Sequence, residues 1–129
     1  MQEQETMGFT RAVKRCLIEK YADFNGRASR SEYWWFTLAA VLASTLVSVL
    51  SDSETAATLF SVAVLLPTWG VGVRRLHDTG RSGWWVLLGF IPLIGQLVLI
   101  WWYVTPSEKG TNRFGMQPPE TLDAFDLMN

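Results

Sequence analysis

RRLHDTGRSGWW, residues 74–85, places three arginines, the single histidine and an aspartate between long stretches that carry no charge. These uncharged runs cover residues 33–50, 56–73 and 83–105, which is 18, 18 and 23 residues. A helix rises about 1.5 Å per residue, so each run has roughly the length needed to cross a hydrocarbon core about 30 Å thick. The spacing predicts an all-α membrane protein in which residues 29–105 form three transmembrane helices.

All seven tryptophans lie toward the ends of these runs, at Trp34, Trp35, Trp69, Trp84, Trp85, Trp101 and Trp102. Indole rings prefer the headgroup level of a bilayer, so this placement indicates aromatic belts. The stretches LAAVLASTLVSVL (38–50) and VLLGFIPLIGQLVLIWW (86–102) are apolar on every side, whereas a buried helix of a water-soluble protein normally keeps a polar face. A water-soluble helical bundle is therefore the less favoured alternative.

Residues 9–24 are predicted to form an amphipathic helix, because apolar side chains recur at spacings of three and four, at Phe9, Val13, Cys16, Leu17, Tyr21 and Phe24. Such a helix lies on the bilayer surface, or it packs its apolar side on the transmembrane helices, and the sequence leaves both arrangements open. We expect residues 1–8 before it to be flexible and Asn25-Gly26 to break it.

The first transmembrane run has a recognisable start. Ser29, followed three residues later by Glu32, matches a capping box, in which the hydroxyl and the carboxylate satisfy backbone N–H groups of the first turn. We therefore expect a capping role for both residues and a helix that begins near Arg30. The connection at residues 51–55 is so short that the first two runs are predicted to form an antiparallel hairpin.

Prolines interrupt the second and the third run. Pro67 lacks the N–H that would bond to the carbonyl of Ala63, so a kink is expected there. Pro92 and Gly95 predict another kink near the middle of the third run, which we expect to cross the membrane as one span. The alternative is a re-entrant hairpin with its apex at residues 91–95, which is less favoured because broken backbone is costly in lipid.

Positive charges predict the orientation. Lysines and arginines number six in residues 1–32 and three in residues 74–82, against none in residues 51–55 and two in the tail from residue 106. With three spans, the N-terminus and residues 74–82 share one side, and the positive-inside rule places them in the cytoplasm. The C-terminal tail, residues 106–129, then falls in the periplasm, and its prolines and polar residues predict partial disorder.

Four motifs carry a family resemblance: NGRASRSEYWWF (25–36), RRLHDTGRSGWW (74–85), IPLIG (91–95) and GTNRFG (110–115). In this order and spacing, the chain resembles the small bacterial inner-membrane proteins grouped as the domain of unknown function 805 family, of the YhaH type. The resemblance covers roughly residues 20–116. It implies a multi-pass protein of the bacterial inner membrane. It attaches no activity to the motifs, so it supplies no catalytic residue.

Five arginines are predicted to converge at one membrane face: Arg27, Arg30, Arg74, Arg75 and Arg81. There they can fix the orientation and attract anionic headgroups, each contributing about 1 kcal/mol near the surface. A sharper hypothesis is a defined site in which arginine forks bind a phosphate or a partner's carboxylate. Asp78 and Glu32 would orient these arginines, and His77 would be a pH-sensitive neighbour. No nucleophile or set of metal ligands accompanies this pair, so we expect no catalytic residue.

The single cysteine, Cys16, excludes an intrachain disulfide, and with one histidine elsewhere it supplies no metal site. We expect no cofactor, and the net charge of -1 gives no electrostatic reason to expect nucleic acid. The sequence favours a non-enzymatic protein that acts on anionic membrane lipids, on another inner-membrane protein or on its own copies. The alternative is an oligomeric subunit of a transport pathway for ions or small molecules, lined by Gln96.

Overall fold

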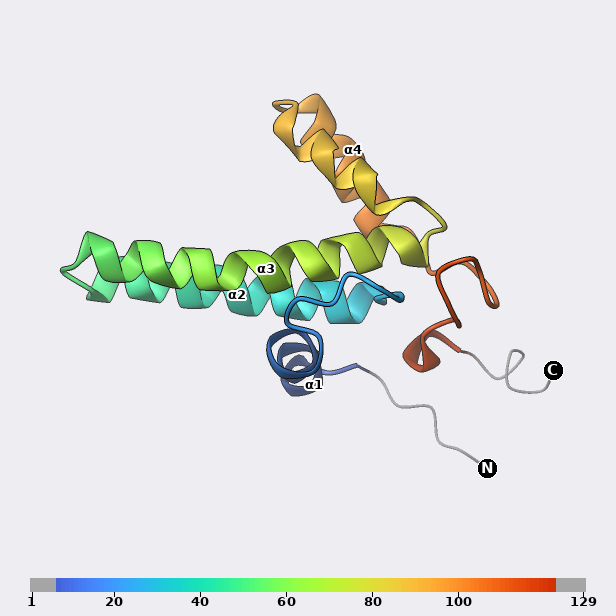
Figure 1. The fold of residues 1–129 in the computed structure, drawn as a ribbon, viewed down its shortest axis with the longest axis horizontal. Coiled ribbons are helices and arrows are strands. Elements are labelled where there is room, and N and C mark those ends of the chain that lie inside the picture. Colours follow the sequence, from blue (N-terminus) through green and yellow to red (C-terminus); the bar gives the residue numbers. More distant parts are fainter. Residues whose placement is uncertain (1–6, 123–129) are drawn as a thin grey trace.

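The computed structural model describes residues 7–122. Its elements are α1 (Phe9–Lys14), η1 (Arg15–Glu19), α2 (Arg30–Leu50), α3 (Glu54–Asp78), η2 (Gly83–Phe90), α4 (Ile94–Val104) and η3 (Pro119–Thr121). Figure 1 shows two long antiparallel helices, a short helix that crosses below them and a helical hairpin that rises from their other side. The flexibility expected for residues 1–6 and the disorder expected for residues 123–129 lie outside the described residues.

The first two apolar runs form the predicted hairpin of long helices, α2 and α3. Each begins at a serine cap: Ser29 Oγ accepts a hydrogen bond from the N–H of Glu32, and Ser53 Oγ accepts one from the N–H of Ala56. Both helices are long and apolar enough to cross a membrane. Only 6% of the apolar window of α2 and 22% of that of α3 is buried, so these helices do not form the core of a water-soluble protein.

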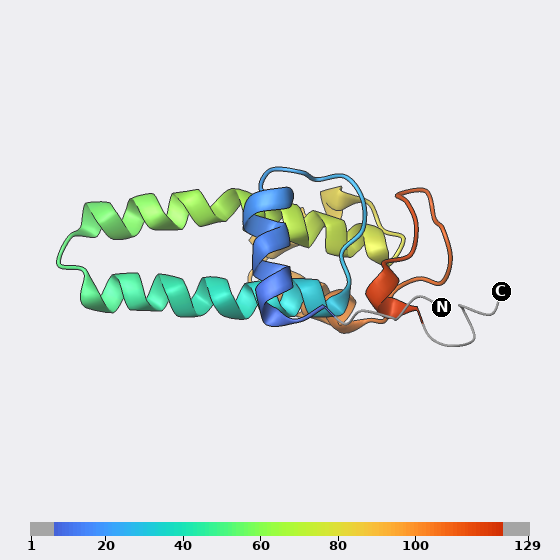
Figure 2. The ribbon, with the colours of Figure 1, turned by 90° about the horizontal axis from the view of Figure 1, so that it is seen from below.

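The segment made of α1 and η1 lies across the two long helices, end-on in Figure 1 and crossing both in Figure 2. Its side chains Ala12 and Cys16 are fully buried, and Cys16 packs in a core with Phe36 and Val71. The amphipathic segment is therefore packed on the long helices, which is one of the two arrangements left open by the sequence. Its α-helix ends at Lys14 and is followed by a π-helical turn that ends at Glu19, rather than reaching residue 24.

The third apolar run differs from the expected single span over residues 83–105. It is divided into η2 and α4, which run in opposite directions and pack on each other as a hairpin (Figure 1). The two halves hold 8 and 11 residues, which is too short to cross a hydrocarbon core about 30 Å thick. The prediction of one continuous third helix is therefore corrected: the run forms a helical hairpin, as in the alternative that the sequence favoured less.

The apex of this hairpin explains the break. Leu93 adopts a φ of 64°, in a tight turn in which the N–H of Ile94 bonds to the carbonyl of Pro92 at 2.7 Å. Gly95 then lets the two halves touch, because a Cβ at this position would lie 1.8 Å from the carbonyl oxygen of Leu88. A proline before the turn and a glycine after it thus close the hairpin.

The described part of the tail, residues 106–122, returns to the end of the molecule where α3 finishes (Figure 1). The N–H of Glu108 bonds to the carbonyl of Asp78 at 2.8 Å. Three full spans would have separated the tail from residues 74–82 by the whole membrane. In the structure these two segments are in contact instead, because the hairpin of η2 and α4 returns the chain to the end of α3.

Candidate functional site

Asp78, the last residue of α3, is the centre of a buried polar cluster. Its carboxylate accepts hydrogen bonds from Arg27 Nε at 2.9 Å and from Arg75 Nη1 at 2.5 Å, and the hydroxyl of Ser107 donates to it as well. The side chains of Arg27, Arg75 and Asp78 are at most 1% exposed. We call the whole cluster the arginine head, and its charged members are Arg15, Arg27, Glu32, Arg74, Arg75 and Asp78.

Glu32, in the first turn of α2, is the second ion-paired centre of the arginine head. Arg74 Nη1 donates to Glu32 Oε2, and Arg15 Nη1 donates to Oε1 at 3.2 Å. Because Glu32 is fully buried, its charge would be costly without these two guanidinium groups. Its carboxylate thus faces arginines instead of the backbone N–H that a capping box requires, while its own N–H bonds to Ser29.

Cys16 lies against this second ion pair. Its Sγ is 3.8 Å from Glu32 Oε2 and 3.8 Å from Arg74 Nη2. Burial, followed by the negative charge of Glu32, raises the pKa of the Cys16 thiol to about 12. The thiol therefore stays protonated at neutral pH and fills space between α1 and the long helices.

Guanidinium groups also cap the C-terminal end of α4. Arg75 Nε donates to the carbonyl of Tyr103 at 3.1 Å, and its Nη2 donates to the carbonyl of Thr105. Arg30 Nη1 donates to the carbonyl of Val104 at 3.3 Å. The last carbonyls of a helix lack partners within the helix and form the negative end of its dipole, so cationic donors stabilise this end.

Arg27 fastens the tail to the arginine head. Its Nη1 donates to the carbonyl of Gly110 at 2.6 Å and to that of Gly115 at 3.3 Å, and its Nη2 donates to the carbonyl of Glu108. One guanidinium thus bonds to Asp78 and to three carbonyls of the tail. This explains why the described tail is folded against the head rather than extended.

His77 connects the tail motif GTNRFG to the start of α2. Its Nδ1 lies 2.9 Å from the carbonyl oxygen of Gly26, and its ring stacks on Phe114 with 3.9 Å between ring centroids. Asn112 Nδ2 donates to the backbone carbonyl of His77 at 2.9 Å. Three of the four family motifs, including the one that contains His77, therefore meet at this histidine.

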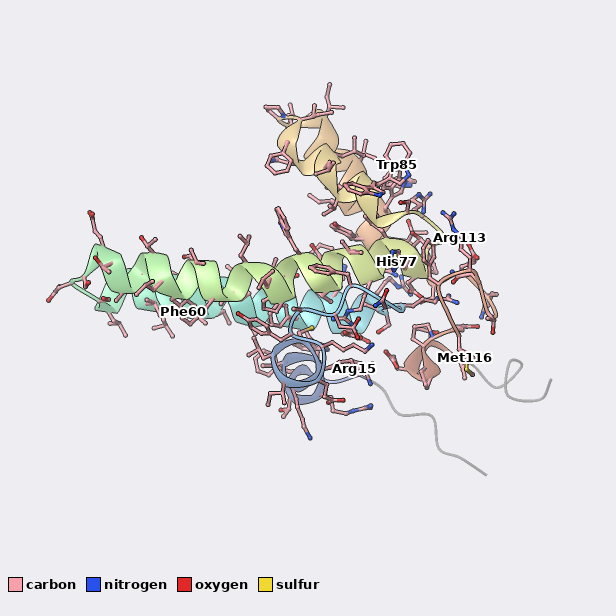
Figure 3. All side chains as sticks on the ribbon, viewed as in Figure 1. Arg15, Phe60, His77, Trp85, Arg113 and Met116 are labelled. Carbon is pink, nitrogen blue, oxygen red and sulfur yellow. The ribbon has the colours of Figure 1, made fainter. Side chains whose placement is uncertain are left out.

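Most of the predicted binding residues are buried in the structure: Arg27, Arg74, Arg75, His77 and Asp78. They face one another and the carbonyls of the chain, so their donors are directed inward. Arg30 is exposed, and Arg81 is half-buried, with its guanidinium 4.4 Å from the centroid of the Trp102 ring. Figure 3 shows the side chains at this end of the molecule. The five arginines do converge, but three of them are buried, and only Arg30 is fully exposed.

Sequence reasoning missed three members of the site. Arg15 pairs with Glu32 and lies 3.6 Å from Glu120 Oε1, and Glu120 also accepts a hydrogen bond from Ser29 Oγ at 2.9 Å. Ser107 bonds to Asp78, as described above. On the predicted helix Arg15 is turned about 100° from its neighbour Cys16, so the amphipathic pattern gave no signal for its contact with Glu32. The contacts of Ser107 and Glu120 depend on the return of the tail and carry no local signal.

Gln96, the candidate for lining a transport pathway, is the third residue of α4 and is exposed. It could therefore line a path only between several copies.

The chain matches known proteins over most of its length. The sequence profile described as "Protein of unknown function (DUF805)" matches residues 21–116. The inner membrane protein YhaI of Escherichia coli (strain K12) is 39% identical over 107 residues, which cover 79% of this chain and 91% of YhaI. The inner membrane protein YhaH of the same strain is 38% identical over 111 residues, which cover 79% of this chain and 92% of YhaH.

A third relative, the uncharacterized protein YiiR of Escherichia coli (strain K12), is 38% identical over 90 residues, which cover 65% of this chain and 59% of YiiR. No solved structure matches the chain. The match to residues 21–116 includes all four motifs, from residue 25 to residue 115, and confirms the resemblance seen in the sequence. Two apolar helices and relatives named as inner membrane proteins agree on a membrane location. The chain belongs to the DUF805 family.

Proposed function

We propose that this chain is a non-enzymatic protein of the bacterial inner membrane that acts through anionic lipid headgroups at its arginine-rich end. The observation that carries the proposal is the different burial of two sets of arginines. Arg27, Arg74 and Arg75 are buried and hold the head together, whereas Arg30 is exposed and Arg81 is half-buried, with its guanidinium 4.4 Å from the centroid of the Trp102 ring. Cations at the headgroup level attract anionic lipids.

We further propose that the arginine head lies in the cytoplasm. Because the tail returns to the head, the segments with six, three and two lysines and arginines all lie at one end, and residues 51–55 at the other end carry none. Residues 31–73, which include the turn between α2 and α3, thus carry none of the eleven positive charges, which is a stronger asymmetry than the nine against two expected for three spans. The positive-inside rule favours the cytoplasm for this end.

Reporter fusions test the orientation. Alkaline phosphatase is active only outside the cytoplasm, so we expect C-terminal fusions to be inactive and a fusion inserted after Asp52 to be active. A green fluorescent protein at the C-terminus should fluoresce. An active C-terminal phosphatase would contradict both the cytoplasmic head and the return of the tail.

The lipid preference is tested with the full-length protein in nanodiscs of phosphatidylglycerol and phosphatidylcholine. We expect phosphatidylglycerol to be enriched around the protein, and the enrichment to fall when Arg30→Glu and Arg81→Glu are combined. Arg113→Glu is the matched control, because Arg113 lies in the tail, where its guanidinium is 4.6 Å from the Phe114 ring centroid (Figure 3). Arg74 and Arg75 are unsuitable for charge reversal because they are fully buried.

Equal enrichment in all variants would overturn the proposal. Retention of one particular membrane protein by the wild type, lost in the Arg30→Glu and Arg81→Glu variant, would assign Arg30 and Arg81 to a protein partner instead.

A further inference from the structure

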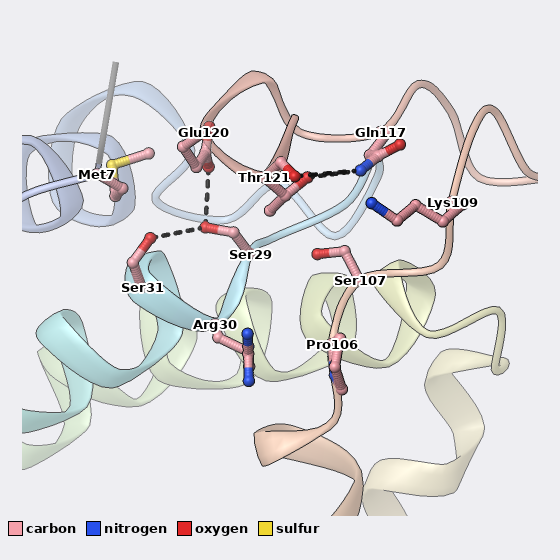
Figure 4. A pocket seen from close by; sticks show the side chains of 10 residues that line it. All are labelled: Met7, Ser29, Arg30, Ser31, Pro106, Ser107, Lys109, Gln117, Glu120 and Thr121. Carbon is pink, nitrogen blue, oxygen red and sulfur yellow. Dashed lines mark hydrogen bonds between the residues drawn. The ribbon is translucent and has the colours of Figure 1, made fainter. Parts of the chain in front are cut away.

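A polar hollow of about 530 Å³ opens beside the arginine head (Figure 4). Its walls come from the start of α2, the segment after α4, the turn around η3 and one residue before α1. The lining residues are Met7, Ser29, Arg30, Ser31, Pro106, Ser107, Lys109, Gln117, Glu120 and Thr121. In Figure 4 Arg30 and Lys109 stand on different sides of the hollow, with the Ser107 side chain between them. Segments distant in sequence thus bring two cations to one hollow.

The charges of the hollow suit an anion. Glu120 is the one carboxylate among its lining residues, and that group is already turned to Ser29 and lies 3.6 Å from Arg15. Arg30 differs from the arginines of the head because it is exposed and gives a single hydrogen bond, to Val104, among the described residues. A guanidinium fork with an ammonium and hydroxyl groups nearby is the donor set that binds phosphate oxygens.

An apolar groove of about 240 Å³ continues from this hollow along α2. Ser31 lines both, and the other residues of the groove are Trp34, Trp35 and Leu38. Positions 31, 34, 35 and 38 follow the i, i+3, i+4, i+7 spacing of one helix face. Both indole rings and Leu38 are 37% to 44% exposed. A polar, cationic hollow is therefore followed by an apolar groove on the same helix face, leading into the apolar part of α2.

We infer that hollow and groove together form a binding site for a single phospholipid, with the phosphate beside Arg30 and Lys109 and one acyl chain along Trp34, Trp35 and Leu38. The two adjoining surfaces match the two ends of an amphiphile, which a soluble phosphate or an uncharged lipid would match only in part. The inference rests on the proposed lipid-facing function and gives it a defined location.

Native mass spectrometry of the full-length protein in detergent tests the site with short-chain phosphatidylglycerol. We expect one lipid to bind to the wild type. Arg30→Gln should weaken binding about tenfold, because it removes a charged donor. Leu38→Trp should weaken it by filling the groove. Arg113→Gln and Leu59→Trp are the matched controls, since Arg113 lies in the tail and Leu59 is an exposed leucine of α3. Melting temperatures of all four variants show whether each one is folded.

Two further probes separate the parts of the ligand. Inorganic phosphate should compete with the phospholipid only weakly, because it cannot occupy the groove, and diacylglycerol should bind weakly, because it lacks the phosphate. Competition by phosphate that equals that of the phospholipid would show a site for soluble anions and overturn the inference. Binding of diacylglycerol as tight as that of phosphatidylglycerol would show an acyl-chain groove alone and also overturn it.

The outcome also separates this inference from the broader proposal. If the wild type enriches anionic lipid to an extent that neither Arg30→Gln nor Leu38→Trp changes, that result would rule out the defined site. It would leave a general preference of the arginine head for anionic over neutral lipid. Absence of any enrichment around the wild type would remove both.

Discussion

The hydroxyl of Tyr21 donates a hydrogen bond to the backbone carbonyl of Ala63, and this is the carbonyl that Pro67 leaves without its helical partner. A residue of the amphipathic segment therefore supplies a hydrogen-bond donor to a carbonyl of α3 that lies 42 positions later in the chain. Next to it, Thr68 Oγ1 donates to the carbonyl of Val64 at 2.8 Å. The helix α3 continues through the proline because neighbouring groups meet its backbone carbonyls.

Tyr21→Phe is predicted to destabilise the protein by about 0.5–1.5 kcal/mol, the net value of one neutral hydrogen bond. In a Pro67→Ala background, residue 67 regains an N–H for the carbonyl of Ala63. The same Tyr21→Phe change should then have little effect. The measurement is a double-mutant cycle on unfolding in mixed micelles. An equal loss in both backgrounds would show that the hydroxyl acts independently of the proline.

Gly95→Ala is predicted to force η2 and α4 apart, because the added Cβ would lie 1.8 Å from the carbonyl oxygen of Leu88. Backbone on both sides cannot yield easily, so we expect a loss of more than about 2 kcal/mol, in the upper range for single substitutions. A spin-label distance between Val86 and Val98, both changed to cysteine in a Cys16→Ser background, should lengthen or broaden.

Gly89→Ala is the matched control for this prediction. It lies on the other half of the hairpin, and a Cβ there would meet only Leu99 Cδ1, at 3.5 Å, which is ordinary contact. Its effect on stability should stay within about 0.5 kcal/mol. Equal effects of the two alanines would show that the close approach at Gly95 does not hold the hairpin.

The parts of the fold that the sequence predicts are those fixed by local pattern. Long apolar runs define α2 and α3, and Ser29 marks where α2 begins, because length and capping are properties of neighbouring residues. The third run passes the same length test. Its division depends on the contact of Gly95 with Leu88, which belongs to the folded hairpin, so Pro92 and Gly95 indicate a break without fixing its angle.

The candidate site likewise has a part that the sequence predicts and a part that depends on the folded chain. Charge counts predict that five arginines converge, since they flank the apolar runs on one side. Whether a guanidinium faces lipid or the protein depends on the tail, which brings the carbonyls of Glu108 and Gly110 to Arg27. Nothing local in the sequence encodes that return, because it follows from the hairpin. Arg27 and Arg75 therefore become structural groups, and Arg30 is left facing outward.

Cys16 is predicted to resist alkylation in the folded protein. Its pKa of about 12 leaves very little thiolate at pH 8, and the side chain is fully buried. The rate with a maleimide should be more than about a thousandfold below that of a free cysteine. Thr10→Cys in a Cys16→Ser background is the control, because Thr10 is exposed on α1. Rapid labelling of Cys16 before unfolding would show that α1 detaches from the long helices.

Asp78→Ala is predicted to be the most damaging change in the arginine head. It leaves Arg27 and Arg75 buried without their carboxylate, and breaking a buried ion pair in this way costs about 3 to 5 kcal/mol. Since Arg27 also holds the tail, trypsin should cut after Arg113 sooner than in the wild type. Asp52→Ala, at an exposed aspartate between α2 and α3, should change neither stability nor cleavage. Lower stability with unchanged cleavage would mean that the hydrogen bonds from Arg27 to the tail carbonyls keep the tail in place without Asp78. The attachment of the tail would then be independent of the Asp78 ion pairs.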